Sequence, residues 1–413
     1  MTNQMKTINR VQNPLLERKN SSSLRLSDFL IMSFWAIYLF VRLWVADSEN
    51  LNESYQAAMV VPYFNGNIGT IMLVLTVIVF GGLLIVNHLK VDSNFLLFLL
   101  RIGLYFIPIL YIEGEFRFGV AYAIIQTMLA YYIGYNYKGK LKTIINILIV
   151  ATLILLGQIF YTLLYNELSI FGSNKWFMRL PGGQTNSLGA FLVISYVIVD
   201  LFYADSKKAI KYLYFVLMWL GVWCTGTRSG ILLLIGYYCL KWGKNIFLDK
   251  SNKGITTKKL LLGVSILFIF GILLIVFKDE LWERVQLFTI EGMTSSRLKV
   301  YSETFEYILQ CPLLGRSAFS YKVFDAVKTH NFLLESLIQT GVLGTIIYLW
   351  IWGYCFSCIS KIQGKKIRTL FQFFILITLI HGFVEPNLFS VTSDTFVWFL
   401  LGVGVSISKK NRG

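Results

Sequence analysis

Long apolar stretches recur along almost the whole chain, and they constrain its fold more than any other feature. Between residues 28 and 408, runs of mostly apolar residues alternate with short polar links. Many of these runs approach the roughly 20 residues that an α-helix needs to cross the hydrocarbon core of a membrane. Hydrophobic residues make up 56% of the chain and charged residues only 15%, whereas a soluble domain carries about a quarter charged residues. The pattern predicts a polytopic membrane protein built from α-helices.

The apolar windows predict about twelve transmembrane helices. The expected spans are 28–45, 68–87, 94–111, 118–137, 141–165, 187–203, 210–224, 229–242, 260–277, 331–360, 369–383 and 393–408. They divide the all-α chain into a cytoplasmic N-terminal tail (1–27), spans one to nine (28–277), a long extracytoplasmic loop (278–330), spans ten to twelve (331–408) and a cytoplasmic tail (409–413).

The distribution of charge predicts the orientation of these spans. If the N-terminus is cytoplasmic, the lysine-rich links at 207–211, 241–259, 361–368 and 409–412 all fall inside, while most acidic residues fall outside. Cytoplasmic links of membrane proteins carry such an excess of Lys and Arg. The net charge of +16 therefore reflects topology, because no soluble segment is large enough to bind nucleic acid. Both termini are expected in the cytoplasm.

The long loop is expected to contain one amphipathic helix. Residues 296–310 place apolar side chains at Leu298, Tyr301 and Phe305, with the spacing of one helical face. Pro312 and Gly315 then end the pattern. Such a helix would lie on the membrane surface or cap a cavity just before the tenth span.

Four polar stretches are expected to meet on the outer face, each at the head of a helix. They are Arg179 to Asn186, the turn containing Arg228, the start of the amphipathic helix at Arg297, and His330-Asn331. Helix N-termini attract anions, and arginine adds a bidentate grip on phosphate. The implied ligand carries phosphate and is met at the membrane surface. Each feature also has a plainer interpretation, since an isolated Arg can snorkel to lipid headgroups and a helix-head His can serve as a cap.

Several further residues remain candidates of lower rank. Glu335, His381 and Glu385 are expected near the same face. Acidic pairs in the first two outer loops, Asp47/Glu49 and Glu113/Glu115, resemble metal-binding carboxylates but are better interpreted as solvated loops. We therefore expect neither a metal nor another cofactor.

Two arginines, Arg42 and Arg101, fall within spans, where a charge marks a buried partner or a polar pathway. The sequence shows no partner for either. Cys355 and Cys358 are expected to be packing residues of an apolar helix.

Together these stretches resemble the O-antigen polymerase and ligase superfamily, whose polymerases are of the Wzy type. The resemblance covers roughly residues 179–344 and depends on the order and spacing of its motifs. They are Arg179 to Ala190, Thr225 to Gly230, and Ser296 through Pro312-Leu313-Leu314-Gly315 to His330-Asn331-x-x-Leu334 and Gly341-x-x-Gly344. Thr185 departs from the family, which often has Pro before the Asn.

The resemblance implies a metal-independent glycosyltransferase of the bacterial plasma membrane with its active site facing outward. It would move a growing O-antigen, capsule or exopolysaccharide chain from undecaprenyl pyrophosphate to a lipid-linked repeat unit, with inversion. His330 would be the catalytic base. Arg179, Arg228, Arg297, Asn186 and Asn331 would bind the pyrophosphate and substrate. A ligase that moves finished glycan to another acceptor, or a non-enzymatic flippase or transporter of lipid-linked sugars, remains the alternative. A chain-length regulator and a flippase are further partners that such a polymerase can have.

Overall fold

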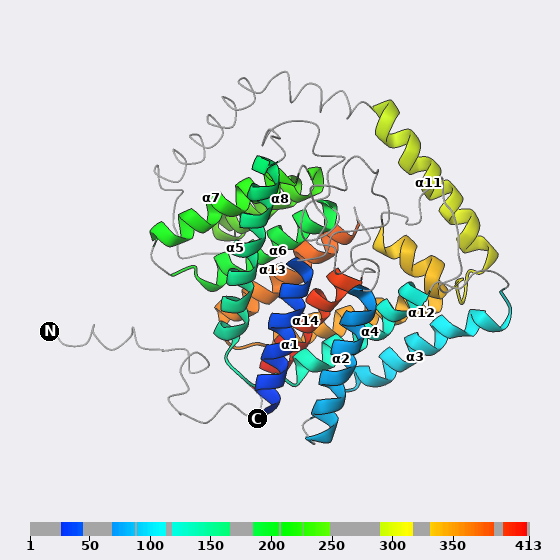
Figure 1. Ribbon diagram of the computed structural model, residues 1–413. Coiled ribbons are helices and arrows are strands. Elements are labelled where there is room, and N and C mark those ends of the chain that lie inside the picture. Colours follow the sequence, from blue (N-terminus) through cyan, green and yellow to red (C-terminus); the bar gives the residue numbers. More distant parts are fainter. Residues whose placement is uncertain are drawn as a thin grey trace.

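The described part of the chain is entirely helical. The computed structural model describes residues 26–43, 68–86, 89–112, 118–165, 185–205, 208–225, 227–247, 290–316, 331–383 and 391–410, which contain twelve α-helices, one short 3-10 helix and no strand. The helices are α1 (Leu26–Leu43), α2 (Ile68–Ile85), α3 (Asn94–Phe106) with η2 (Ile107–Leu110), α4 (Phe118–Tyr135), α5 (Leu141–Tyr165), α6 (Thr185–Phe202), α7 (Lys208–Cys224), α8 (Arg228–Phe247), α11 (Ile290–Gln310), α12 (Phe332–Ser360), α13 (Lys365–Gly382) and α14 (Val391–Lys410). Figure 1 shows α14 in the middle of the bundle and α11 at its edge.

The expected apolar spans coincide with helices to within a few residues wherever the chain is described. The span at 260–277 lies outside the described residues. Among those described, two helical stretches, Leu141–Leu164 and Phe332–Ser360, are long and apolar enough to cross a membrane by length and composition. Shorter apolar stretches occur in α1, α2, α3, α6, α7 and α8. The all-helical, largely apolar architecture fits a membrane protein.

One expected helix start was wrong, and one expected span contains a break. The helix of the long loop begins at Ile290 and not at Ser296, and residues 290–296 contain no Pro that would interrupt it. Arg297 therefore lies inside α11 and not at its head. The expected continuous helix over 331–360 is interrupted at Gly341, which has φ 60° and ψ −167°.

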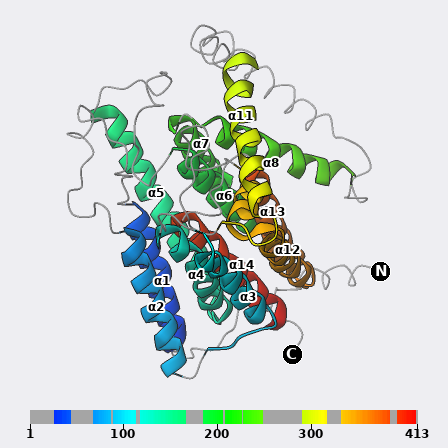
Figure 2. The same cartoon turned by 90° about the vertical axis from the view of Figure 1, so that its right-hand side faces the viewer.

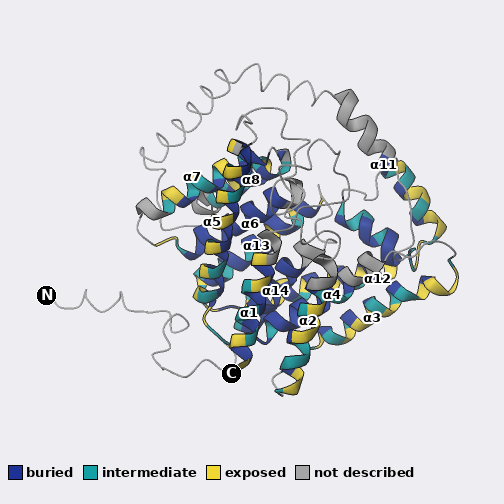
Figure 3. Cartoon of the chain, viewed as in Figure 1, coloured by how far each residue is buried: buried dark blue, intermediate teal, exposed yellow. Residues whose placement is uncertain are grey.

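The centre of the bundle is the contact between α4 and α14. A Cβ atom at Gly134 would lie 2.0 Å from the carbonyl oxygen of Phe399, and one at Gly402 would lie 2.1 Å from that of Tyr131. Glycine at both positions lets the two backbones touch, as small residues do between membrane helices. Aromatic side chains complete this core, since the ring of Trp35 in α1 stacks 4.5 Å from that of Phe399. Figure 3 shows α14 and α6 as the most deeply buried helices.

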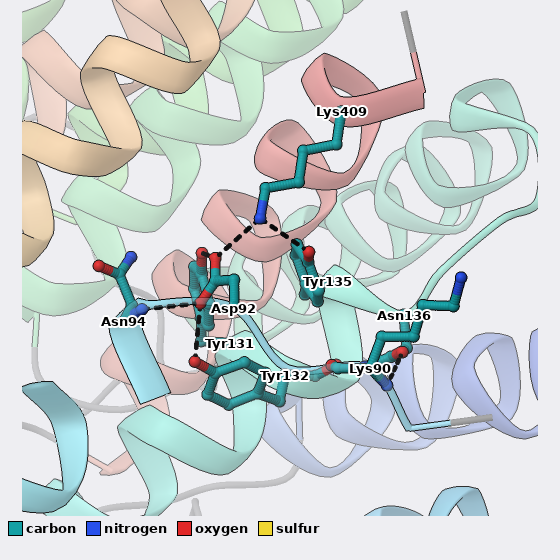
Figure 4. A network of polar contacts seen from close by, with 8 residues as sticks. All are labelled: Lys90, Asp92, Asn94, Tyr131, Tyr132, Tyr135, Asn136 and Lys409. Atoms are coloured by element: carbon teal, nitrogen blue, oxygen red, sulfur yellow. Dashed lines mark hydrogen bonds and ion pairs between the residues drawn. The ribbon is translucent and has the colours of Figure 1, made fainter. Parts of the chain in front are cut away.

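One end of the bundle is held together by a buried carboxylate. Asp92, in the link between α2 and α3, accepts hydrogen bonds from the hydroxyls of Tyr131 (3.0 Å) and Tyr132 (2.9 Å) in α4. Lys409 near the end of α14 lies 3.6 Å from the same carboxylate and donates to Tyr135 (Figure 4). The end of α14 is thereby fixed beside the end of α4. We call this set the Asp92 cluster.

A second ionic cluster joins α6, α7 and α8. Buried Asp200 near the end of α6 accepts a hydrogen bond from Tyr237 and pairs with Lys211 at 2.9 Å and with Lys241. Lys211 lies near the start of α7, and Lys241 lies toward the end of α8. The three helices therefore alternate in direction, as the short links between them require.

Candidate functional site

The head of α12 is capped and tethered by one side chain. The Asn331 side-chain oxygen accepts hydrogen bonds from the backbone N–H groups of Leu333 (2.9 Å) and Leu334 (3.2 Å). Its amide nitrogen donates to the carbonyl oxygen of Phe383, 3.3 Å away, just beyond α13. The rings of Phe332 and Phe383 meet with their centroids 4.9 Å apart. The head of α12 is thus held against the end of α13.

The head of α6 packs tightly against the turn between α7 and α8. A Cβ atom at Gly189 would lie 2.2 Å from the Thr227 hydroxyl, and one at Gly230 would lie 2.6 Å from the same oxygen. Thr225 and Thr227 share a hydrogen bond of 2.8 Å, which closes the turn. Two of the stretches that the sequence singled out, at 179–190 and 225–230, therefore meet through their small residues.

The same end of the bundle includes the last turn of α13. Lys366, the second residue of α13, pairs with Asp205 just beyond α6 at 2.7 Å. The ion pair places the start of α13 beside the end of α6. Because the two helices pack together along their lengths, they run antiparallel. Buried His381 near the end of α13 accordingly lies alongside the first turns of α6. The heads of α6, α8 and α12 and the tail of α13 therefore lie at the end of the molecule opposite the Asp92 cluster. Figure 2 shows α6, α8, α12 and α13 grouped together in the bundle.

The break in α12 is closed by the loop that follows α11. The N–H groups of Val342 and Leu343, freed at the break, donate to the carbonyl oxygens of Pro312 (2.9 Å) and Leu313 (3.3 Å). In return, the Arg316 N–H donates to the Ile338 carbonyl at 2.6 Å. Non-helical backbone inside a membrane protein is tolerated where neighbouring groups restore its hydrogen bonds in this way. We call residues 312–316 with residues 338–343 the α12 clasp.

Polar side chains line the α12 segment between its head and the clasp. Buried Glu335 accepts a hydrogen bond of 2.9 Å from Gln339. Thr345, beyond the break, donates to the Ser336 hydroxyl at 3.0 Å. The bond between Thr345 and Ser336 joins the two halves of α12 across Gly341. Glu335, a lower-ranked candidate in the sequence, is therefore a buried carboxyl group one turn from the α12 head.

Arg101 has an aromatic partner that the sequence did not reveal. Its guanidinium carbon lies 4.1 Å from the centroid of the Tyr348 ring in α12, and both residues are buried. A cation over an aromatic ring is stabilised most strongly where water is excluded. The partners are 247 residues apart in sequence (348 − 101), so no local pattern could pair them.

The structure describes the predicted site residues unevenly. His330, Arg179 and Glu385 lie outside the described residues. The backbones of Asn186, Arg228 and Arg297 are helical, whereas their side chains lie outside the description.

Arg228 is the first residue of α8, as expected of a helix head, and Asn186 is the second residue of α6. Asn331, Glu335 and His381 are fully described.

These features define a class of protein. An all-helical bundle built largely from apolar helices fits the architecture of a membrane protein.

Comparison with known families places the chain within that class. Residues 213–349 match the family described as O-antigen ligase. The match runs from α7 to the second half of α12, and so includes the Arg228 turn, α11 and the α12 clasp. Members of the family are glycosyltransferase-like enzymes that act on lipid-linked glycans in membranes, which supports an enzymatic role in glycan transfer. A comparison with curated proteins found no match.

Proposed function

We propose that this protein polymerises a surface polysaccharide at the outer face of the bacterial plasma membrane. The growing chain leaves undecaprenyl pyrophosphate and is joined to a lipid-linked repeat unit. The observation that carries the proposal is the family match, which spans the motif region from the Arg228 turn to the α12 clasp. The basic ends of the helices near the Asp92 cluster support a cytoplasmic position for that end, and hence an outward position for the heads of α6, α8 and α12.

The chemistry is a single displacement at the anomeric carbon of the donor sugar. A hydroxyl of the acceptor attacks this carbon, His330 takes the hydroxyl proton, and the bond from carbon to the pyrophosphate oxygen breaks. Arg179, Arg228 and Arg297 stabilise the negative charge that develops on the leaving pyrophosphate. The donor configuration is inverted because the attack comes from the opposite face.

The α12 head supports the role of His330 through its neighbour. Asn331 is fixed to Leu333, Leu334 and Phe383 by three hydrogen bonds. The residue that precedes it is therefore attached to a rigid point between α12 and α13. His381, Glu335 and Glu385 remain candidates for a second role at this end, and the residues assigned to the reaction require no metal.

A deletion strain complemented with variants tests the proposal. We expect wild type to restore long chains, and His330→Ala to leave single repeat units on the carrier lipid, with a rate lowered by about 10²-fold or more. His88→Ala is the matched control, because it removes one of the other two histidines from a link expected in the cytoplasm. Normal chain length in His330→Ala, at normal protein level, would exclude the assigned base.

The family description favours one second candidate, a ligase that transfers finished glycan to another acceptor. The same experiment separates the two. A polymerase deletion leaves single repeat units on the carrier, whereas a ligase deletion leaves complete long chains stranded there.

A further inference from the structure

Arg316 is held in place by neutral groups and has no carboxylate partner among the described residues. One terminal nitrogen donates to the Gln310 side-chain oxygen. The guanidinium carbon lies 5.1 Å from the centroid of the Tyr307 ring. The Nε atom is buried and makes no hydrogen bond to the described residues. The guanidinium group is thus oriented but keeps both its positive charge and unused donors.

The backbone of Arg316 is fixed as firmly as its side chain. Its N–H donates to the Ile338 carbonyl within the α12 clasp, and the preceding carbonyl of Gly315 accepts from the Tyr111 hydroxyl at 3.3 Å. Ile338 lies seven residues beyond Asn331, or about 10 Å along the helix axis. Arg316 therefore has a fixed position near the α12 head, between α11 and α12.

A structural role explains only part of this arrangement. Arg316 follows the end of α11, where a positive charge interacts favourably with the helix dipole. An interaction with the helix dipole requires neither the aromatic ring beside the guanidinium group nor an Nε donor without a hydrogen bond to the described residues. A half-buried guanidinium without a counter-ion is costly, and a bound anion removes that cost. Phosphate matches the fork of donors that arginine presents.

We propose that Arg316 is a binding residue for the phosphate of a lipid-linked substrate, in addition to the arginines assigned above. The inference rests on the proposed function. Polymerisation brings together a donor and an acceptor that both carry a lipid pyrophosphate, so it requires more than one cationic position. Arg316 supplies a preorganised one, because Tyr307 and Gln310 orient its guanidinium before any ligand arrives.

The test is direct binding to the full-length protein in nanodiscs of phosphatidylcholine, with undecaprenyl pyrophosphate as the probe. We expect Arg316→Gln to bind it about tenfold more weakly than wild type, because a charge-assisted phosphate contact is lost. Arg316→Lys keeps the positive charge but loses the planar set of paired donors, so its affinity should lie between those of wild type and Arg316→Gln. Arg368→Gln is the matched control, since Arg368 lies in the first turn of α13 at the opposite end of the bundle. Melting temperatures are measured for each variant.

The outcomes separate this inference from the proposed function. Equal affinities of wild type, Arg316→Gln and Arg316→Lys would overturn the role of Arg316 while leaving the function intact. Failure of wild type itself to bind the probe would overturn both. A second arm adds phosphatidylglycerol to the nanodiscs, and an effect of Arg316→Gln confined to that lipid would assign the contact to bulk headgroups and overturn the substrate role. If Arg316→Gln does not fold, Arg316→Lys decides the question.

Discussion

Gly315 and Gly341 lie against each other, and both have positive φ. Their φ angles are 71° and 60°, and a Cβ atom at Gly315 would lie 2.5 Å from the backbone nitrogen of Gly341. One glycine turns the chain out of α11, and the other breaks α12. Because each needs a conformation that L side chains rarely adopt, the α12 clasp depends on glycine at both positions.

Replacing Gly341 by alanine should therefore destabilise the clasp. The added Cβ would lie 2.3 Å from the Leu313 carbonyl oxygen at a φ that disfavours alanine. We expect a loss of roughly 1–3 kcal/mol from backbone strain and a lower melting temperature. Gly353→Ala is the control, because nothing lies within 4 Å of a Cβ atom there. If both variants melt alike, the clasp contributes no stability.

The two functions of the Asn331 side chain can be separated. Asn331→Asp keeps the oxygen that caps α12 but loses the donor to Phe383, whereas Asn331→Ala loses both. We expect Asn331→Ala to lose about 1 kcal/mol of stability and Asn331→Asp to lose less. If the tether to α13 positions His330, both variants should lose polymerising activity. Measured kcat and KM, with melting temperatures, check this, and full activity of Asn331→Asp would show that the tether is dispensable.

The contact between Arg101 and Tyr348 should depend on the ring and not on its hydroxyl. Tyr348→Phe keeps an aromatic face beneath the guanidinium, whereas Tyr348→Leu removes it. We expect Tyr348→Leu to be less stable than Tyr348→Phe by about 2 kcal/mol in this buried setting. When both changes are repeated in an Arg101→Met background, the difference in stability between Tyr348→Leu and Tyr348→Phe should become smaller. A difference that persists in that background would reflect packing of the ring alone.

The pair of Asp205 and Lys366 should make stability depend on acid pH. Hydrogen bonding and charge interaction with Lys366 lower the pKa of Asp205 below its usual value. A lowered pKa contributes stability that is present above the usual pKa of about 4 and is lost as pH falls through the folded-state value. We expect wild type to melt slightly above Asp205→Asn at pH 7, with the difference lost near pH 2. Because Asp205 is exposed, the effect should be small and should diminish in high salt. A difference that is unchanged across this pH range would exclude the ion pair as its source.

The buried carboxylate of Asp92 predicts a further effect at the other end of the bundle. Tyr132→Phe removes one of its hydrogen bonds and should cost about 1.5–3 kcal/mol, as expected for a bond to a charged group. Lys409→Met should cost less, since Lys409 is partly exposed to solvent. Tyr212→Phe removes a hydroxyl from an exposed tyrosine of α7 and serves as the control in the same melting experiment. If Lys409→Met proves the more damaging change, the order of these contributions is wrong.

Apolar length was sufficient to predict nearly every helix, because burial in lipid or in the bundle demands the same continuous apolar run. The order of the motifs likewise predicted the family match over residues 213–349. The break at Gly341 was not predictable, since glycine also occurs where the helix continues, as at Gly353 in the second half of α12. Its cause is the loop at 312–316, whose carbonyl groups replace the missing helical partners. Contacts between distant residues, such as Arg101 and Tyr348, leave no periodic trace in a single sequence.

The contact between Gly134 and Phe399 has a consequence for biosynthesis. The surface of α4 that receives α14 is made early, yet the helix that fills it follows after most of the chain has left the ribosome. During that interval the surface of α4 that contacts α14 lacks this partner, and the earlier helices can pack only against one another. Assembly of the core is thus delayed until α14 is inserted. A nascent chain interrupted before that point would present an incomplete bundle to cellular quality control.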